Sequence, residues 1–292
     1  MRPSHVFLAV LVAAVWGFNF VVIRIGITNF PPLLFSAFRF TLAALPLVFF
    51  IRKPDVPWRI ILGIGMVLGV VKFSLLFIGM DLGLSAGLAS LVLQSQAFFT
   101  AILVALVFKE MPRAMQGVGI AVAFAGIGLI ATTVDNSVTP IGLGLVLAAG
   151  FMWAVSNLLM KQAGQVDMLA LIVWVSLVPP IPLFILSMTF EGVDAGMAAI
   201  TNLNVQGVGA ILYIAFISTI FGFAVWGKLI REYGAATVAP FSLLVPIFGM
   251  GSSTLVLGEE FGMVRLIAAV MVIVGLVLTV VVIPKGVRGL SR

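Results

Sequence analysis

Apolar runs of about twenty residues recur along the whole of this 292-residue chain, and the short stretches between them hold most of its charges. An α-helix rises about 1.5 Å per residue, so a run of this length crosses a hydrocarbon core of about 30 Å. Only 9% of the residues are charged, whereas 62% are hydrophobic and the mean hydropathy is +1.29. A soluble domain carries roughly 25% charged residues. The chain is therefore predicted to be an all-α integral membrane protein that lies in the lipid bilayer.

Charges, prolines and asparagines divide the apolar sequence into ten predicted transmembrane helices. They are placed near 4–26, 32–51, 58–80, 84–108, 113–133, 140–162, 168–190, 204–230, 236–257 and 262–283. The longest polar interruption runs from Glu191 to Asn204. No evident cleavage site of small residues follows the run that begins at Val6, so this run is predicted to be the first span rather than a signal peptide. The connections leave no room for a soluble catalytic domain.

The basic residues are distributed unequally between the two ends of the predicted spans. If the N-terminus is cytoplasmic, twelve of the sixteen bases fall on the inner side: Arg2, Arg52, Lys53, Arg59, Lys109, Arg113, Lys161, Lys228, Arg231, Lys285, Arg288 and Arg292. The outer side then holds only Arg24 and Arg265, together with six acids. Because Lys and Arg favour cytoplasmic loops, both termini are predicted to be cytoplasmic. The bases form no single patch, so the pI near 10.2 does not indicate a nucleic-acid partner.

Two stretches of the chain repeat one another. The sequence "WGFNFVVIR", Trp16–Arg24, matches "WAVSNLLMK", Trp153–Lys161, at an offset of 137. Further along, "LSAGLASLVLQSQAFF" from Leu84 matches "YGAATVAPFSLLVPIFG" from Tyr233 at an offset near 149. Each copy contains five spans, an odd number, so the two copies cross the membrane in opposite directions. Such inverted repeats are typical of alternating-access transporters.

The two copies are predicted to cover residues 1–137 and 138–292. Together with "WGFNF" in span one, an arginine in span two and a "GE" that closes span nine, this arrangement resembles the drug/metabolite transporter superfamily and its EamA-type exporters. Within these it is most similar to YddG-type exporters of aromatic amino acids. The family motif matches Trp16, Gly17, Asn19, Phe20, Pro246, Gly258 and Glu259. The proline common in span four of relatives is absent, and Gln96 with Ala97 stands opposite Pro246.

Two tryptophans and two asparagines of the repeated motif are candidate substrate-binding residues. Trp16 and Trp153 lie about twelve residues into their spans, hence about 18 Å deep, below the interfacial aromatic belt. Each either packs between helices or forms an aromatic wall for a substrate. Asn19 and Asn157 carry amides whose burial without a partner costs several kcal/mol. A bond between helices contributes only about 0.6 kcal/mol, so a wet cavity is the preferred interpretation for both amides.

Lys72 lies about fourteen residues into predicted span three. A lysine at the bilayer centre costs at least about 2.5 to 3.5 kcal/mol, and every acid of the chain is predicted to lie at a span end or in a loop. Lys72 therefore either extends its ammonium group to the membrane surface or faces water and an anionic ligand. Arg39 is predicted to be shallower, with a gating or structural role and its guanidinium at the surface or on helix-end carbonyls.

Spans four and nine supply the remaining candidates. Gln94 and Phe98, four residues apart, share a helical face, and Ser242 with Pro246 form a corresponding pair of a polar residue and a helix breaker. All four are predicted to contact substrate. The proline releases a backbone carbonyl, which either binds an ammonium group or simply permits a bend of the helix.

Two glutamates complete the predicted site. Glu110 and Glu259 close spans four and nine near water, so they are expected to anchor loops, in a gating or structural role, rather than carry protons.

The resemblance implies a secondary transporter that exports small metabolites, most of all aromatic or other apolar amino acids, across the bacterial inner membrane. The alternatives are other cargo, namely cationic drugs or nucleotide sugars, and a channel. With no cysteine, one histidine and no phosphate-binding loop, the sequence predicts neither an enzyme nor a metal site, and no cofactor. The predicted partners are a small-molecule substrate and the lipid bilayer, without an obligate protein partner.

Overall fold

A computed structural model describes residues 1–109, 114–164 and 166–280, and within these residues the chain is helical, with two isolated β-bridges in place of any strand. Eight of its helical stretches are long and apolar enough to cross a membrane, and two shorter apolar helices complete the set of ten. The predicted all-α membrane fold of ten spans is therefore confirmed. It is a multi-pass membrane protein.

Each half of the described chain supplies five spans. The first half contains α1 (Pro3–Asn29), α2 (Pro32–Val48), a third span of α3 (Trp58–Ile64), η1 (Gly65–Lys72) and α4 (Phe73–Asp81), a fourth of α5 (Ala86–Val92) and α6 (Ser95–Phe108), and α7 (Ala114–Ala131). The second half contains α8 (Pro140–Gln162), a seventh span of α9 (Met168–Val175), α10 (Pro180–Leu186) and η2 (Ser187–Glu191), an eighth of α12 (Val205–Leu212), η3 (Tyr213–Phe221) and α13 (Gly222–Tyr233), a ninth of α14 (Ala235–Val238), η4 (Ala239–Leu243) and α15 (Leu244–Leu257), and α16 (Met263–Val280).

Capping residues and prolines fix several of these starts. Thr139, Asp167 and Asn204 each accept a hydrogen bond from a backbone N–H of the first helical turn, which satisfies a donor that has no partner within the helix. Pro3 and Pro32 open α1 and α2, where the missing N–H of proline costs nothing.

The polar interruption that separates spans seven and eight contains a helix that the sequence did not predict. This helix, α11 (Val193–Thr201), carries exposed apolar side chains at Val193, Met197 and Ile200. A short helix with an exposed apolar face is suited to the boundary between lipid and water.

Spans three and four of the first half and spans eight and nine of the second half interrupt their helices at corresponding places, whereas span seven is interrupted and its counterpart α2 is continuous. Spans three and eight both contain a π-helical segment, η1 and η3. Span four breaks between α5 and α6 at Leu93 and Gln94, although it has no proline there, and span nine changes to the 3₁₀ segment η4. Both of these spans end in a left-handed residue, Lys109 at φ 58° and Gly258 at φ 67°. The inverted repeat is therefore visible in the backbone as well as in the sequence.

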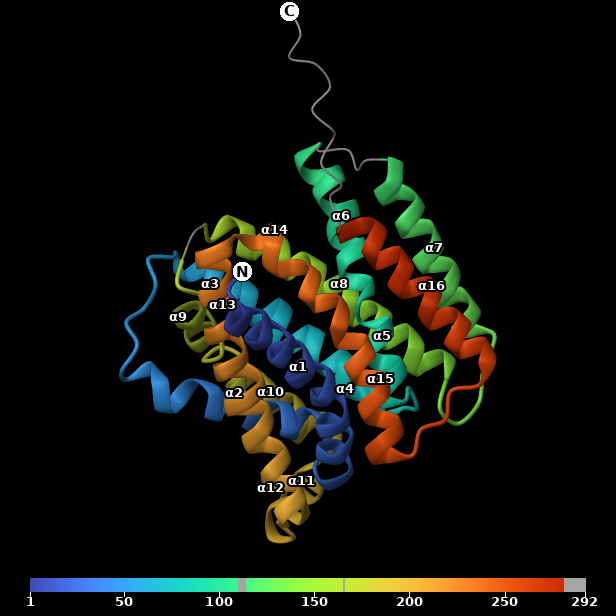
Figure 1. Ribbon diagram of the computed structural model, residues 1–292. Coiled ribbons are helices and arrows are strands. Elements are labelled where there is room, and N and C mark those ends of the chain that lie inside the picture. The colour runs from blue at the N-terminus through green and yellow to red at the C-terminus, as the bar shows by residue number, and fades with distance from the viewer. Residues whose placement is uncertain (110–113, 165, 281–292) are drawn as a thin grey trace, which may run out of the picture.

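Contacts between the halves follow the same symmetry. Helix α1 packs on α15, and its counterpart α8 packs on α6. Helices α7 and α16, the last of each half, lie side by side (Figure 1). Their backbones approach so closely that a Cβ on Gly119 would lie 2.7 Å from the carbonyl oxygen of Gly275. Small residues allow this close packing, which drives helix association in lipid.

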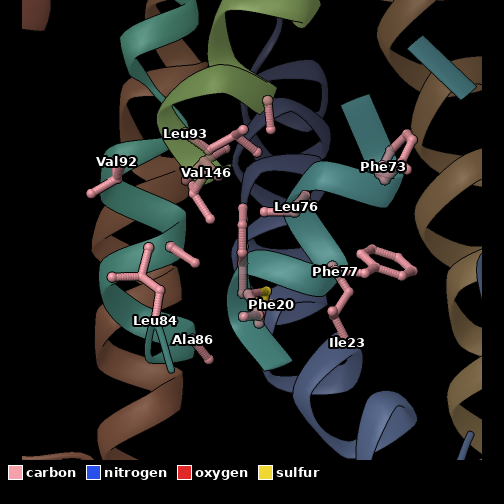
Figure 2. Close-up of a cluster of buried hydrophobic side chains, with 14 of the residues drawn as sticks. Phe20, Ile23, Phe73, Leu76, Phe77, Leu84, Ala86, Val92, Leu93 and Val146 are labelled. Carbon is pink, nitrogen blue, oxygen red and sulfur yellow. The ribbon is translucent and has the colours of Figure 1, made fainter. Parts of the chain in front are cut away.

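Part of the buried core lies where α1, α4, α5 and α8 meet (Figure 2). Phe20 and Ile23 of α1 face Leu76 and Phe77 of α4 in this cluster. The ring of Phe73 lies 5.7 Å from that of Phe77 in a T-shaped arrangement, which aromatic pairs prefer. This packing fixes Phe73 directly after the π-helical segment η1.

Candidate functional site

Lys72 is the last residue of η1 and is almost completely buried, at 2% exposure. Its Nζ lies 3.4 Å from the ring centroid of Phe73 and 4.5 Å from that of Trp153 in α8. The ammonium group therefore rests on aromatic rings from both halves of the protein, an arrangement in which cation–π attraction offsets part of the lost hydration. π-Helical segments often mark functional sites in helices.

Arg39 of α2 reaches the same ring. It is 4% exposed, and its Cζ lies 3.8 Å from the centroid of Phe73 and 5.0 Å from that of Phe40. Its Nη2 donates a hydrogen bond of 3.2 Å to Thr219 in η3, whereas Nε and Nη1 are buried and find no partner in the described part of the chain. The expectation that this guanidinium reaches the surface or helix-end carbonyls is therefore wrong, because neighbouring spans cover it and its hydrogen bond goes to Thr219.

The two cations, which we call the cation pair Lys72/Arg39, lie near each other without an acid among the described residues. Arg39 Cζ and Lys72 Nζ both lie close to the centroid of the Phe73 ring. The separation between the two charges is therefore smaller than the sum of their distances to this centroid. The ion pairs found in the described part of the chain, such as Arg231–Asp167 and Arg265–Asp135, lie elsewhere. Like charges in a medium of low dielectric repel each other strongly. An anionic ligand would relieve this repulsion, so the geometry is suited to binding a carboxylate or phosphate group.

The two asparagines of the repeated motif differ in their partners. Asn19 is 9% exposed, and its Oδ1 is buried without a hydrogen-bond partner among the described residues. Asn157 donates from Nδ2 to Gln96 Oε1 at 2.9 Å and to Thr100 Oγ1 at 3.1 Å. A buried polar atom without a partner costs about 1–3 kcal/mol. Asn19 is therefore free to accept from a ligand, whereas Asn157 already links α8 to α6.

The two tryptophans differ in the same way. Trp16 packs on Phe223 and Trp226, at centroid distances of 5.4 and 5.0 Å, and its Nε1 donates to the carbonyl of Ser218. Gly222 makes room for it, since a Cβ there would lie 2.7 Å from that Nε1. Trp16 is thus held between helices, while Trp153 lies beside the ammonium group of Lys72.

The remaining candidates lie on the broken spans four and nine. Gln94 donates from Nε2 to the carbonyl of Ser242 at 3.3 Å, which ties the two breaks together. Pro246 is buried in the first turn of α15. Phe98 is fully buried and packs on Phe124 of α7, at a centroid distance of 6.0 Å, so its ring lies in a packing position.

Two glutamates of the second half cap helices of the first. Glu259 accepts from the backbone N–H groups of Ala86 and Gly87, at 2.7 and 2.9 Å, at the start of α5. Glu191 accepts from Leu33 and Leu34 at the start of α2, at 2.6 and 3.2 Å. A carboxylate at a helix N-terminus is stabilised by the unpaired donors and the helix dipole.

Of these two caps, Glu191 was not among the predicted site residues, because nothing in its local sequence shows that the chain folds back onto α2. Glu110 lies outside the described residues.

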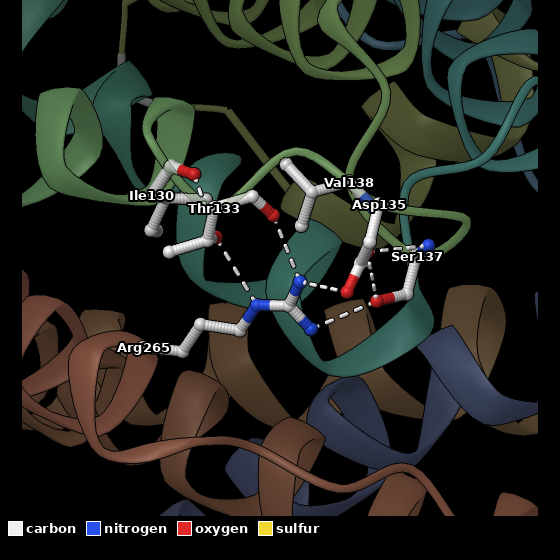
Figure 3. Close-up of polar contacts among 6 residues, drawn as sticks. All are labelled: Ile130, Thr133, Asp135, Ser137, Val138 and Arg265. Carbon is white, nitrogen blue, oxygen red and sulfur yellow. Dashed lines mark hydrogen bonds and ion pairs between the residues drawn. The ribbon is translucent and has the colours of Figure 1, made fainter.

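A polar network closes the same end of the bundle at α16 (Figure 3). The guanidinium of Arg265 donates to the Thr133 hydroxyl and carbonyl, to Ser137 Oγ and to the carboxylate of Asp135. These four contacts join α16 to the connection between α7 and α8. The described residues hold no cluster of His, Cys, Asp and Glu suited to a metal ion.

Comparison with known proteins places this arrangement in context. The family profile described as "EamA-like transporter family" matches residues 3–132 and 140–281. A "Probable amino-acid metabolite efflux pump" of Salmonella typhimurium is 40% identical over 286 residues, 96% of each chain. The protein of that name from Escherichia coli K12 is 38% identical over 94% of this chain and 93% of its own. A solved crystal structure with 14% identity, covering 95% of this chain and 96% of its own, has a TM-score of 0.62 and shows the fold alone.

Proposed function

The chain belongs to the EamA-like transporter family, and we propose that it exports amino acids with aromatic or other apolar side chains from the cytoplasm across the bacterial inner membrane. The observation that carries this proposal is the buried, acid-free cation pair Lys72/Arg39 on the ring of Phe73. The printed names of the Salmonella and Escherichia relatives, which refer to efflux of amino-acid metabolites, support it. Transport by alternating access follows from the inverted repeat.

Each part of an amino acid has a matching group in the site. The cation pair Lys72/Arg39 attracts the carboxylate, and Trp153 beside Lys72 offers an aromatic surface to an apolar side chain. The unpartnered Oδ1 of Asn19 can accept from the ammonium group. Backbone carbonyls near the breaks of spans four and nine, close to Ser242 and Pro246, are further acceptors for it.

The cation pair also supports a second candidate cargo. A phosphate ester such as a nucleotide sugar carries more negative charge than an amino acid, and it favours more than one buried base. Sequence reasoning found only Lys72 suitable, but the structure adds Arg39. Cationic drugs have no such support, because the described spans bring no carboxylate to the cation pair.

A flux screen in proteoliposomes tests the proposal. Purified protein is assayed with labelled amino acids, nucleotide sugars and cationic dyes. We expect saturable flux of phenylalanine, tryptophan or leucine, accelerated by unlabelled substrate loaded on the opposite side. Flux of nucleotide sugars alone would replace the amino-acid proposal by the second candidate. Flux without acceleration by counter-substrate would indicate a channel.

The direction of export depends on the predicted orientation, with both termini in the cytoplasm. Reporter fusions after Arg52 and Arg231 are expected to be cytoplasmic, and fusions after Asp81 and Asp135 periplasmic, because Lys and Arg favour the inner loops. The opposite pattern would reverse the proposed direction.

A further inference from the structure

A cavity of about 360 Å³ opens at the end of the bundle that the charge distribution predicts to face outward. It lies where the end of α1, the turn between α4 and α5, the connection between α7 and α8, and the end of α15 meet. Its polar lining consists of Arg24, Thr28, Ser85, Asn136, Ser137 and Glu259. Ile25, Met80, Leu84 and Leu257 supply an apolar surface. The cavity thus offers both signs of charge together with an apolar wall.

Arg24, the last residue of the repeated motif, lines this cavity with its side chain fixed by a hydrogen bond. Its Nη1 donates a hydrogen bond of 3.0 Å to the carbonyl of Met80, which orients the guanidinium. A guanidinium has five N–H donors, and its planar fork matches the two oxygens of a carboxylate. The other donors of Arg24 have no partner among the described residues, so they are available to a carboxylate in the cavity.

The opposite charge comes from Glu259, whose carboxylate is fixed by the N–H groups of Ala86 and Gly87. Each carboxylate oxygen has a second lone pair that can accept from an ammonium group. Beside it, the Oγ of Ser85 is buried and has no hydrogen-bond partner among the described residues. Because Ser85 lines the cavity, rotation of its side chain would bring this unsatisfied hydroxyl to a ligand, which would supply the missing partner.

Backbone hydrogen bonds make this wall rigid. Gly83 at φ 106° allows the chain to turn sharply between α4 and α5, a conformation that other residues rarely adopt. The N–H of Ser85 then donates to the carbonyl of Ser137 at 3.0 Å, and that of Thr139 donates to the carbonyl of Gly83 at 3.2 Å. The polar groups are therefore preorganised, which lowers the entropy lost on binding.

We propose that this cavity is an outer subsite for a zwitterionic amino acid, with Arg24 on the carboxylate and Glu259 and Ser85 on the ammonium group. The choice of an amino acid as ligand rests on the proposed function. A substrate released from the central site enters the subsite before it leaves the protein, and the same amino acid outside the cell occupies it directly.

Equilibrium binding of labelled L-phenylalanine to the full chain in nanodiscs tests this proposal. The wild-type protein binds two molecules, Lys72→Met keeps the outer one, and Arg24→Gln keeps the central one with its outer affinity lowered about tenfold or more. Arg24→Lys loses less, because the charge remains without the fork. Phenethylamine and 3-phenylpropionate, which lack one charged group each, compete at the outer subsite at least about tenfold more weakly.

Two further variants sharpen this test. Ser85→Ala weakens phenylalanine more than 3-phenylpropionate at the outer subsite, because only phenylalanine has the ammonium group that Ser85 would hold. Glu260→Gln changes an exposed neighbour of Glu259 that does not line the cavity, and it leaves both affinities unchanged.

The outcomes separate this proposal from the proposed function. Binding of one molecule, lost in Lys72→Met and unaffected in Arg24→Gln, would overturn the outer subsite and leave amino-acid export standing. Binding that depends on Arg24 but not on Lys72 would support the subsite and contradict the central site. Equal loss of both sites in Arg24→Gln and Arg24→Lys would show that Arg24 serves the fold, which also overturns the subsite.

Discussion

The two halves of the protein interrupt spans three and eight, and spans four and nine, at corresponding positions but place different side chains there. The π-helical segment η1 of the first half ends in buried Lys72, whereas η3 of the second half ends in Phe221. The other buried cation of the central site, Arg39, also belongs to the first half, and η3 supplies only its partner Thr219. The backbone symmetry is what two alternating states require, because each half takes the role of the other. We propose that the asymmetric charges orient a substrate between the two halves.

Removal of the Lys72 charge from the first half is expected to have the largest effect on substrate affinity. Lys72→Met raises the substrate concentration for half-maximal flux by about 10- to 100-fold, because a charge-assisted hydrogen bond contributes about 1.5–3 kcal/mol. Lys72→Arg retains part of the affinity, since the charge remains. The matched control is Lys161→Met, at an exposed lysine near the end of α8, with a change below about twofold. Equal effects of the two methionine variants would show that burial of Lys72 has no role in binding.

The two tryptophans allow the halves to be compared directly. Trp153→Ala weakens substrate affinity about tenfold with normal folded yield, because it removes the aromatic surface beside Lys72. Trp16→Ala keeps the affinity but lowers the folded yield, because Trp16 packs on Phe223 and Trp226. Flux and size-exclusion yield of both variants provide the check. The reverse pattern would show that Trp16 of the first half, rather than Trp153, forms the aromatic surface for the substrate.

The glutamate caps are expected to have a smaller effect. We expect opening of the outer end to separate Glu259 from α5 and Glu191 from α2, so Glu→Gln at either position is expected to favour the open state by about 1 kcal/mol, or about fivefold. The chain has no cysteine, so Ser253→Cys, at a buried position near Gly87, gives a single label. Its reaction with an impermeant maleimide added outside is expected to accelerate in both variants and to stay unchanged in Glu260→Gln. Unchanged labelling in both cap variants would show that the caps do not hold the outer end closed.

The smallest expected effect is the loss of stability when Asp135 is removed from the polar network of Figure 3. Burial of Asp135 raises its pKa, but hydrogen bonds from Ser137 and Arg265 outweigh this and lower the pKa to about 2. The stabilisation is therefore complete above the unfolded pKa near 3.9 and is lost as the pH falls towards 2. Because Asp135 is half exposed, Asp135→Asn is expected to remove about 1 kcal/mol or less.

Thermal unfolding in detergent measures the difference in stability between the wild-type protein and Asp135→Asn. This difference is expected to be constant from pH 7 to 5 and to shrink only below about pH 4. A difference that changes between pH 7 and 5 would show that another group titrates.

The sequence predicted correctly those features that depend on a single helix, such as the position of each span. The span predicted at 140–162 coincides with α8, and the other spans agree to within a few residues where their ends are described, because apolar length and capping residues are local properties. The predicted start at residue 113 and the predicted end at residue 283 lie outside the described residues. The family resemblance, stated from "WGFNF" and the closing "GE", is confirmed by the match over both halves of the chain. The division between the halves at residue 137 stays a prediction.

Side-chain environments were harder to predict, because they depend on how spans far apart in sequence pack together. Depth along a span suggested a surface position for Arg39, but burial by α4 and η3 is a tertiary property. Asn157 finds its partners on α6, and Phe98 turns towards α7. The outer cavity is assembled from four separate segments. The sequence drew attention to Arg24 as the end of the repeated motif and to Glu259 as a loop anchor, but it did not bring the two together.

The most direct test of the account is counterflow of labelled phenylalanine in proteoliposomes, compared between the wild-type protein and Lys72→Met. We expect loaded phenylalanine to accelerate labelled uptake in the wild type, whereas phenethylamine, which lacks the carboxylate, is at least about tenfold less effective. In Lys72→Met the two compounds become nearly equal, because the group that distinguishes them is gone. Equal counterflow by both compounds in the wild type, or undiminished discrimination in Lys72→Met, would contradict a carboxylate site at Lys72.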